Sequence, residues 1–272
     1  MNSRQFQSTT GTVLAITPVS ETSHVVTWLT PDLGKLVTVA KGAYRPKSIF
    51  LGQYDLFYTC EVLFYRTKPA GMHIARECWT INSRTSLRQN WRAACAASYI
   101  CDLASKNVVP YRNERNVFEL TNRTLDFFTE VTPAPQVLLW YELALAGAIG
   151  LSPRLFTCPV CERPLVGKEH NIFSVKSGGL VCGKCSEAGR TQNKGKDAED
   201  VPEYTIPVTP DIFSILRRWQ NESSPRFAQT TKCTPSQMAV LSDILLSFLS
   251  FHAAPAPVSR AIALNLLLKE VT

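Results

Sequence analysis

Short runs of β-branched and aromatic residues recur through the first part of the chain. The runs are residues 12–16, 25–30, 35–40, 54–63 and 72–79. A turn signal at Pro31–Gly34 joins the second and third runs, and alternating polar and apolar positions follow it, which predicts a β-hairpin. Five short strands in so few residues favour a small β-barrel, which we expect to span residues 1–80.

From about residue 81 the spacing of apolar side chains changes to three and four, which is typical of helices. The side chains that would share a helix face are Leu87, Trp91, Ala94 and Cys95 in one stretch, and Val117, Leu120 and Phe128 in the next. Pro135 in a first turn and Gly150 as a stop bound a third predicted helix. We expect residues 81–157 to form the first part of a helical domain.

The helical pattern returns near the end of the sequence. Thr209 and Thr234 are good N-caps, and each precedes a proline at the first helical turn. One apolar face would hold Met238, Leu241, Leu245 and Leu249, and a last helix is expected over 259–269. Residues 186–203 contain almost nothing to bury, which predicts a mobile loop or linker. Residues 191–272 would then hold the linker and the second part of the helical domain.

The composition narrows the class of protein. Of 272 residues, 45% are hydrophobic and 19% are charged, which excludes wholesale disorder and fits one large domain or two to three small ones. The sequence has no apolar run near the roughly 18 residues of a membrane span, and its polar start lacks a signal peptide's apolar core. We therefore expect a cytoplasmic protein with no membrane partner. The net charge of +7 fits a polyanionic partner, or a merely solvated basic surface.

The most specific local motif is a pair of C-x-x-C sequences. Cys158 and Cys161 form the first pair, Cys182 and Cys185 form the second, and 20 residues lie between the pairs. Each tight turn presents two thiolates to one side, so two turns can complete a tetrahedron around Zn²⁺. Four thiolates leave no coordination position for water, so the predicted zinc site in residues 158–190 is structural. The alternatives are a redox dithiol or vestigial cysteines, and nearby His170 is interpreted as a surface residue.

Motifs of catalysis are absent from the sequence. It contains no phosphate-binding glycine-rich loop, no nucleophile elbow and no H-E-x-x-H helix. The four histidines lie far apart in the sequence. A catalytic triad assembled from distant residues stays possible, because such residues need not be neighbours in sequence. We expect a protein that is not an enzyme.

Two groups of cations are candidates for phosphate binding. The cations Lys35, Lys41, Arg45 and Lys47 cluster around one strand and its following loop, with Tyr44, Phe50 and Tyr54 among or next to them. Interleaved cations and aromatics suit single-stranded nucleic acid, because phosphates meet the charges and bases stack on the rings. Arg84, Arg88 and Arg92 are spaced by four and would form one stripe on a helix. The alternatives are solvated lysines with aromatics in the core, and arginines that neighbouring acids neutralise.

Several motifs occur in an order that resembles one family. They are Thr10-Gly11-Thr12-Val13-Leu14, Ala40-Lys41-Gly42-Ala43 with Arg45 and Lys47-Ser48, Trp140-Tyr141-Glu142-Leu143, Gly150-Leu151-Ser152-Pro153, and the cysteine pairs with Phe173-Ser174 and Gly178-Gly179 between them. In this order the chain resembles RecO, the family of bacterial recombination mediators. The similarity runs through residues 10–185 and weakens beyond them.

The resemblance implies an α+β fold, in which an OB-fold barrel precedes an α-helical domain with an inserted zinc module. It also implies binding to single- and double-stranded DNA, annealing of complementary strands, and contact with the C-terminal tail of single-stranded DNA-binding protein. With RecR, family members help to load RecA onto coated DNA. Our hypothesis is therefore a DNA-binding mediator. The rivals are a zinc-ribbon scaffold that binds only proteins, and a zinc-stabilised enzyme with a dispersed active site.

Overall fold

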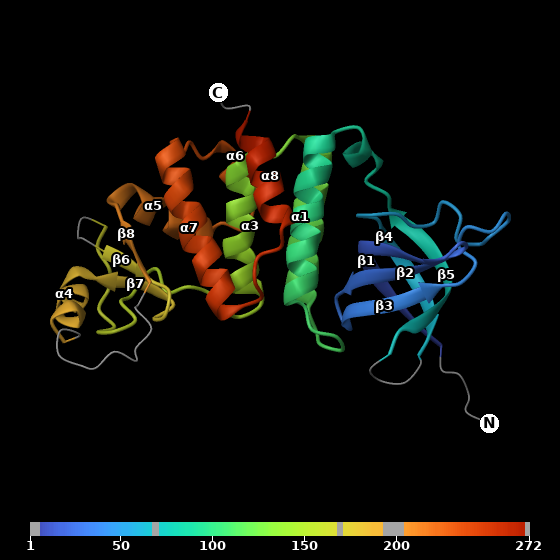
Figure 1. The fold of residues 1–272 in the computed structure, drawn as a ribbon, viewed down its shortest axis with the longest axis horizontal. Coiled ribbons are helices and arrows are strands. Elements are labelled where there is room, and N and C mark those ends of the chain that lie inside the picture. Colours follow the sequence, from blue (N-terminus) through green and yellow to red (C-terminus); the bar gives the residue numbers. More distant parts are fainter. Residues whose placement is uncertain (1–5, 67–70, 168–170, 193–203, 270–272) are drawn as a thin grey trace. The chain divides into compact units, whose positions relative to one another are not determined.

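The structure is a computed structural model that describes residues 6–66, 71–167, 171–192 and 204–269 (Figure 1). Within these ranges the chain forms two compact units. One unit contains the described residues up to Pro133 and from Pro257 onward, and the other is Ala134–Ala256. The units therefore have other boundaries than the domains expected from the sequence, because the first two long helices group with the strands. No helix among the described residues is long and apolar enough to cross a bilayer.

Five strands close into a barrel in the first unit, in the order β1-β2-β3-β5-β4. The strands are β1 (Phe6–Ser20), β2 (Ser23–Thr30), β3 (Gly34–Ala40), β4 (Thr59–Tyr65) and β5 (His73–Asn82). Neighbouring strands are antiparallel except β3 and β5, which pair in parallel through Thr38↔His73 and Val39↔Ile74. The predicted barrel and hairpin are confirmed. The strand expected over 54–63 begins later, because Tyr58 donates to the carbonyl of Asp55 in a turn.

The barrel interior explains why these residues form strands. Alternate positions of β3 are buried, so one face of the strand packs into the core and the other faces outward. Trp28 lies in the core, and its indole Nε1 donates to Thr38 Oγ1 over 2.9 Å. A Cβ at Gly11 would lie only 3.2 Å from the Trp28 side chain, so glycine allows β1 to approach this ring.

Helices follow the barrel within the first unit. They are the 3₁₀ helix η1 (Thr85–Arg88), α1 (Trp91–Asn107), α2 (Arg115–Glu130) and α8 (Ser259–Leu268). The single helix face predicted from Leu87 to Cys95 is wrong, because Asn90 starts a new helix by accepting a hydrogen bond from the backbone N–H of Ala93. Leu87 is buried before this cap, whereas Trp91 after it is 58% exposed. The predicted apolar face of α2 is confirmed as buried.

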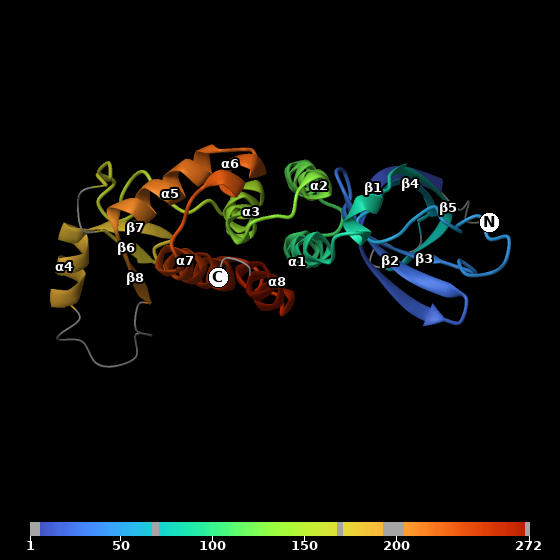
Figure 2. The same cartoon turned by 90° about the horizontal axis from the view of Figure 1, so that it is seen from above.

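The second unit is built around α3 (Pro135–Ala148), whose side chains are buried on nearly every face. The surrounding elements are β6 (Asn171–Ser174), β7 (Gly179–Cys182), α4 (Gly183–Gln192), β8 (Thr205–Val208), α5 (Pro210–Asn221), α6 (Pro225–Thr230) and α7 (Pro235–His252). Helix α3 packs against α5, α6 and α7 (Figure 2). Pro135 and Gly150 delimit α3 as predicted, and Thr234 caps α7 in a capping box with Gln237.

A small antiparallel sheet, in the order β7-β6-β8, holds the cysteine segment. The sequence did not reveal these strands, since each has only four residues. The prediction of a loop over 186–203 is wrong for its first part, because α4 continues through Gln192. This segment is too polar to show an apolar face, although its alanine, glutamate and glutamine favour helix. The rest of that loop, 193–203, and His170 lie outside the described residues.

Candidate functional site: a four-cysteine cluster and a basic groove

Backbone pairing brings the two cysteine pairs together. Arg154 pairs in parallel with Gly179, and the Arg154 carbonyl accepts from the backbone N–H of Leu180 over 2.9 Å. A Cβ at residue 179 would lie 2.4 Å from that carbonyl oxygen, so only glycine permits this approach. The segments that follow Arg154 and Gly179 run parallel to each other, which brings Cys158 and Cys182 close together.

Each cysteine pair lies on its own turn. In the first, the N–H of Glu162 donates to the Cys158 carbonyl over 2.9 Å, and Glu162 takes the left-handed conformation at φ 59°. The second pair lies where β7 ends and α4 begins, so Cys185 is in the first turn of the helix. The N–H groups of a helix start stabilise a nearby thiolate.

The four sulfurs have the geometry of a metal site. Their Sγ atoms all lie within 4.8 Å of one another, and those of Cys161 and Cys182 are 3.8 Å apart. Four sulfurs at about 2.3 Å from a tetrahedral Zn²⁺ would be about 3.8 Å apart, whereas a disulfide requires about 2.05 Å. The cluster is therefore open enough to hold a metal ion and too wide for a disulfide.

Electrostatics at the cluster also favour a cation. Burial raises the pKa of the Cys158 thiol, but backbone hydrogen bonds from Cys182, Cys161 and Val160 outweigh it and lower the pKa to about 6. Burial and hydrogen bonds with Cys161 and Cys182 raise the pKa of Cys185 to about 12. Neighbouring thiolates repel one another, so the last thiol keeps its proton. A bound divalent cation offsets the repulsion between the thiolates, so that all four can lose their protons. The four-sulfur donor set fits Zn²⁺.

A basic groove lies on the barrel. Its volume is about 780 Å³, and its cations are Lys41, Arg45, Lys47 and Arg76. In the described part of the chain, no carboxylate forms an ion pair with any of these four side chains. Cations without a protein counter-ion leave a positive potential in a concave surface, which attracts polyanions.

The loop that carries three of these cations is ordered by turns. The N–H of Gly42 donates to Ser23 Oγ over 3.1 Å, and the N–H of Tyr44 donates to the Thr22 carbonyl over 3.1 Å, so the β1–β2 turn holds the loop. Gly42 has φ +66°, and Lys47 has φ 66°, a conformation that only glycine adopts freely. The groove is thus held in place before any ligand binds.

The predicted barrel residues do not all meet at this groove. Lys35 lies at the opposite end of β3 from Lys41, and its Nζ donates to the Ser105 carbonyl over 2.5 Å at the end of α1. Among the aromatics, Phe50 is buried in the core, whereas Tyr44 is 60% exposed beside the cations. Tyr54 is partly buried and bonds His24 Nδ1 through its hydroxyl over 2.9 Å.

The arginine stripe predicted for one helix does not form. Arg84 precedes η1, Arg88 ends it and Arg92 belongs to α1. The Arg84 side chain is 2% exposed, and its guanidinium donates to Asp126, Asn122, Thr59 and the Phe57 carbonyl. A cation so enclosed cannot reach a phosphate, so Arg84 is removed from the candidate interface.

The other two members of the stripe keep partial access to solvent. Arg88 forms an ion pair with Asp55 and lies 5.4 Å from the ring centroid of Tyr58. Arg92 lies 5.0 Å from the ring centroid of Trp91. An acid therefore neutralises Arg88, as one of the alternatives to phosphate binding had it. Phosphate binding by Arg88 or Arg92 stays a prediction.

Arg76 is the groove residue that sequence reasoning missed. It lies on β5, in a strand with no other cation among its ten residues. The parallel pairing of Val39 with Ile74 places Arg76 beside the loop that starts at Lys41. Pairing between strands that are not consecutive leaves no local signal in the sequence.

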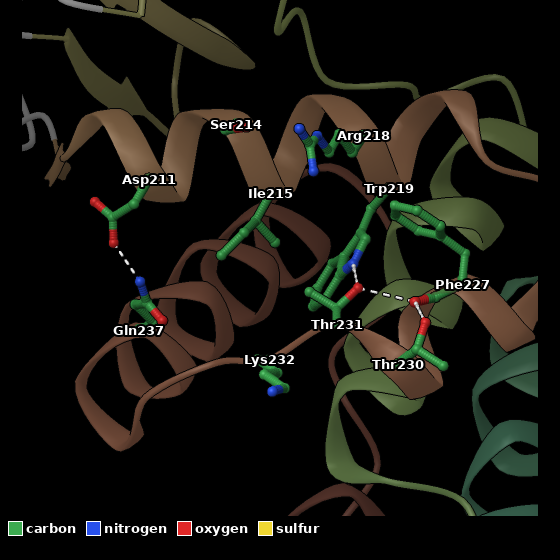
Figure 3. A pocket seen from close by; sticks show the side chains of 10 residues that line it. All are labelled: Asp211, Ser214, Ile215, Arg218, Trp219, Phe227, Thr230, Thr231, Lys232 and Gln237. Carbon is green, nitrogen blue, oxygen red and sulfur yellow. Dashed lines mark hydrogen bonds between the residues drawn. The ribbon is translucent and has the colours of Figure 1, made fainter.

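A second concave site lies in the second unit, between α5, α6 and the start of α7 (Figure 3). Its volume is about 440 Å³. Ile215, Trp219 and Phe227 supply apolar surface, and Trp219 Nε1 donates to Thr231 Oγ1 over 3.2 Å. Arg218 and Lys232 are exposed cations at the same site, and Asp211 opposite them is held by Gln237.

Comparison with known proteins agrees with this architecture. The model of the recombination protein O N-terminal domain matches residues 1–84, and that of the C-terminal domain matches residues 88–261. A DNA repair protein RecO from Syntrophus aciditrophicus is 27% identical over 215 residues, which cover 79% of this chain and 76% of that protein. The RecO of Dehalococcoides mccartyi is 28% identical over 209 residues, covering 77% of this chain and 76% of the relative.

A RecO protein from Bacillus cereus is 25% identical over 212 residues, which are 78% of each chain. The two domain models together span the barrel, the helices from α1 to α7 and the four-cysteine cluster. The closed five-stranded barrel and the helical region after it are the arrangement that the sequence resemblance implied. The chain belongs to the recombination protein O family, RecO.

Proposed function

We propose that this protein is a non-enzymatic recombination mediator that binds single- and double-stranded DNA and anneals complementary strands. It would act on strands coated with single-stranded DNA-binding protein, and it would help RecR to load RecA. The relatives are bacterial DNA repair proteins, which supports a role in repair. Its place of action would be the bacterial cytoplasm, at the nucleoid.

One observation carries the proposal: four cations line a preformed groove on the barrel and have no carboxylate partner among the described residues. They are Lys41, Arg45, Lys47 and Arg76. A DNA backbone releases condensed counterions when such cations replace them, so affinity should fall steeply as salt rises. Neutralising two strands at once lowers their mutual repulsion, which permits annealing without ATP.

The pocket between α5, α6 and α7 supports contact with an acidic protein tail (Figure 3). Ile215 and Phe227 would accept an apolar side chain, while Arg218 and Lys232 would pair with carboxylates. An apolar floor with a basic rim suits the acidic C-terminal tail of single-stranded DNA-binding protein. The Zn²⁺ at Cys158, Cys161, Cys182 and Cys185 would hold the neighbouring sheet together and take no part in a reaction.

The test is an annealing assay. Two complementary oligonucleotides, each coated with single-stranded DNA-binding protein, are mixed with and without the protein in the absence of ATP. We expect faster annealing with the native chain, and loss of that acceleration with the double variant Lys41→Glu and Arg45→Glu. The control is Lys269→Glu, which reverses an exposed charge outside the barrel.

The outcomes separate the candidate functions. DNA binding without acceleration would leave a DNA-binding zinc protein that is not a mediator. Neither binding nor acceleration would favour the zinc-ribbon scaffold that contacts only proteins. If the double variant binds and anneals like the native chain, the groove is not the interface, even where the mediator function holds.

A further inference from the structure

A pair of aromatic rings lies directly beside the basic groove. Phe6 begins β1 and pairs with Tyr65 at the end of β4, and their ring centroids are 4.2 Å apart at an interplanar angle of 39°. Phe6 is 52% exposed, although a phenyl ring in a barrel protein is ordinarily covered. Tyr65 also lines the groove itself, so the ring pair and the cations belong to one continuous surface.

The register of the strands fixes how close the rings and the cations are. Tyr65 pairs with Ile74 of β5, and Arg76 is two residues further along that strand. Ile74 in turn pairs with Val39, two residues before Lys41. Tyr65 is therefore about one strand spacing, roughly 5 Å, from the β5 backbone that carries Arg76, and Phe6 on β1 is one strand further away.

Carboxylates limit this surface on its other side. Moving along the strands away from the groove, Leu63 pairs with Glu77, and Glu61 pairs with Trp79. Glu61 accepts a hydrogen bond from Ser8 Oγ over 2.7 Å. Trp79 is also exposed, at 47%, but it lies beyond Glu77 on β5 and directly opposite Glu61 on β4, and these two carboxylates would repel a phosphate backbone.

We infer that the Phe6–Tyr65 ring pair is a stacking platform for the unpaired bases of single-stranded DNA whose phosphates lie in the basic groove. This inference rests on the proposed function and adds a basis for selecting single strands. Bases of a duplex are already stacked and cannot lie on a protein ring, whereas unpaired bases can. Duplex DNA would therefore use the cations alone.

Binding of a fluorescent oligo-dT strand and of a duplex of equal length, at one fixed salt concentration, tests the inference. Phe6→Ala and Tyr65→Leu are made singly, the latter to keep an apolar side chain in place. We expect each variant to bind oligo-dT roughly tenfold more weakly, since each removes one stacking surface. Duplex affinity should stay within about twofold of the native value. Trp79→Ala, the matched aromatic control, should change neither affinity.

The results distinguish rings that stack on DNA bases from rings that only support the basic groove. Native oligo-dT affinity in both ring variants would overturn the platform. Equal losses for oligo-dT and duplex would also overturn it, because the rings would then merely support the groove. If Tyr65→Leu does not fold, Phe6→Ala alone decides, since Phe6 is largely exposed. If Lys41→Glu with Arg45→Glu weakens both DNA forms while the ring variants bind normally, the proposed function stands and only the platform falls.

Discussion

Arg84 donates from Nε to Asp126 Oδ1 over 2.6 Å, and this ion pair joins the end of the barrel to α2. The same guanidinium donates to Thr59 of β4 and to Asn122 of α2. Asn122 Oδ1 also accepts from Thr12 Oγ1 over 2.7 Å. The arginines spaced by four assigned this cation to phosphate binding, whereas the structure makes it part of the fold. Its replacement should therefore change the stability of the protein.

Replacing Arg84 with alanine should lower the free energy of unfolding by about 3 kcal/mol. The reason is that the substitution removes a buried guanidinium that donates to Thr59, Asn122 and the Phe57 carbonyl. Chemical denaturation monitored by circular dichroism measures the change. The folded variant should bind DNA with native affinity, because Arg84 does not reach the surface.

The matched control is Arg88→Ala, which removes an arginine from an exposed ion pair with Asp55. Such a pair contributes at most about 1 kcal/mol. If Arg84→Ala keeps native stability but loses DNA affinity, the buried hydrogen bonds of Arg84 do not stabilise the fold. The hypothesis that Arg84 binds phosphate would then be right.

The barrel could be predicted from the sequence because its signals are local. Runs of β-branched residues and the turn at Pro31–Gly34 depend only on near neighbours along the chain. The four-cysteine cluster was predictable for the same reason, since both C-x-x-C turns are self-contained. The helix break at Asn90 was missed because the apolar period continues across it, from Leu87 to Trp91, although the two residues lie in different elements.

The groove was only partly predictable, because long-range pairing determines it. Lys35 and Lys41 are six residues apart in sequence but lie at opposite ends of β3. Conversely, Arg76 is far from Lys41 in sequence, and the parallel β3–β5 pairing brings it to the same groove. The burial of Arg84 likewise depends on α2, which a pattern of charges cannot reveal.

The cysteine cluster should bind one Zn²⁺ per chain. Cys158→Ser and Cys182→Ser should each lose the metal and destabilise the second unit by several kcal/mol, since structural zinc contributes directly to folding. Metal analysis of the purified protein measures the stoichiometry, and the spectrum of a Co²⁺-substituted sample reports thiolate ligation. Cys233→Ser is the control, because Cys233 lies outside the cluster. A metal content unchanged by both cluster variants would contradict a four-cysteine site.

Stability should fall in mild acid because two barrel histidines are held neutral. Burial lowers the pKa of His73, with a further effect from Arg66, and burial also lowers that of His24 against the opposing charge of Asp55. The unfolded chain then binds a proton below about pH 6.5 that the folded chain does not, so stability is full above that pH and declines as pH falls.

The slope of this decline is at most about 1.4 kcal/mol per pH unit for each histidine, the value for one proton. His73→Gln should lower stability at pH 8 but reduce the further loss between pH 7 and pH 5. Glutamine can still bond Tyr111, whose hydroxyl is 2.7 Å from His73 Nε2. Both the native chain and His73→Gln contain the cysteine cluster, so any stability lost there at low pH cancels in the comparison. Parallel stability curves for both proteins would show that His73 does not titrate in this range.

Arg76 and Lys35 should differ in their effect on DNA binding, because only Arg76 lines the groove. Arg76→Gln should weaken binding to single-stranded and duplex DNA alike. Its plot of log affinity against log salt should become shallower by about 0.7 for a single strand, the value for one lost phosphate contact. Lys35→Gln should leave the salt slope unchanged, since its ammonium donates to the Ser105 carbonyl at the other end of β3. Equal slopes for Arg76→Gln and the native chain would place the phosphate path elsewhere on the barrel, and a reduced slope for Lys35→Gln would show that the path extends along the whole of β3.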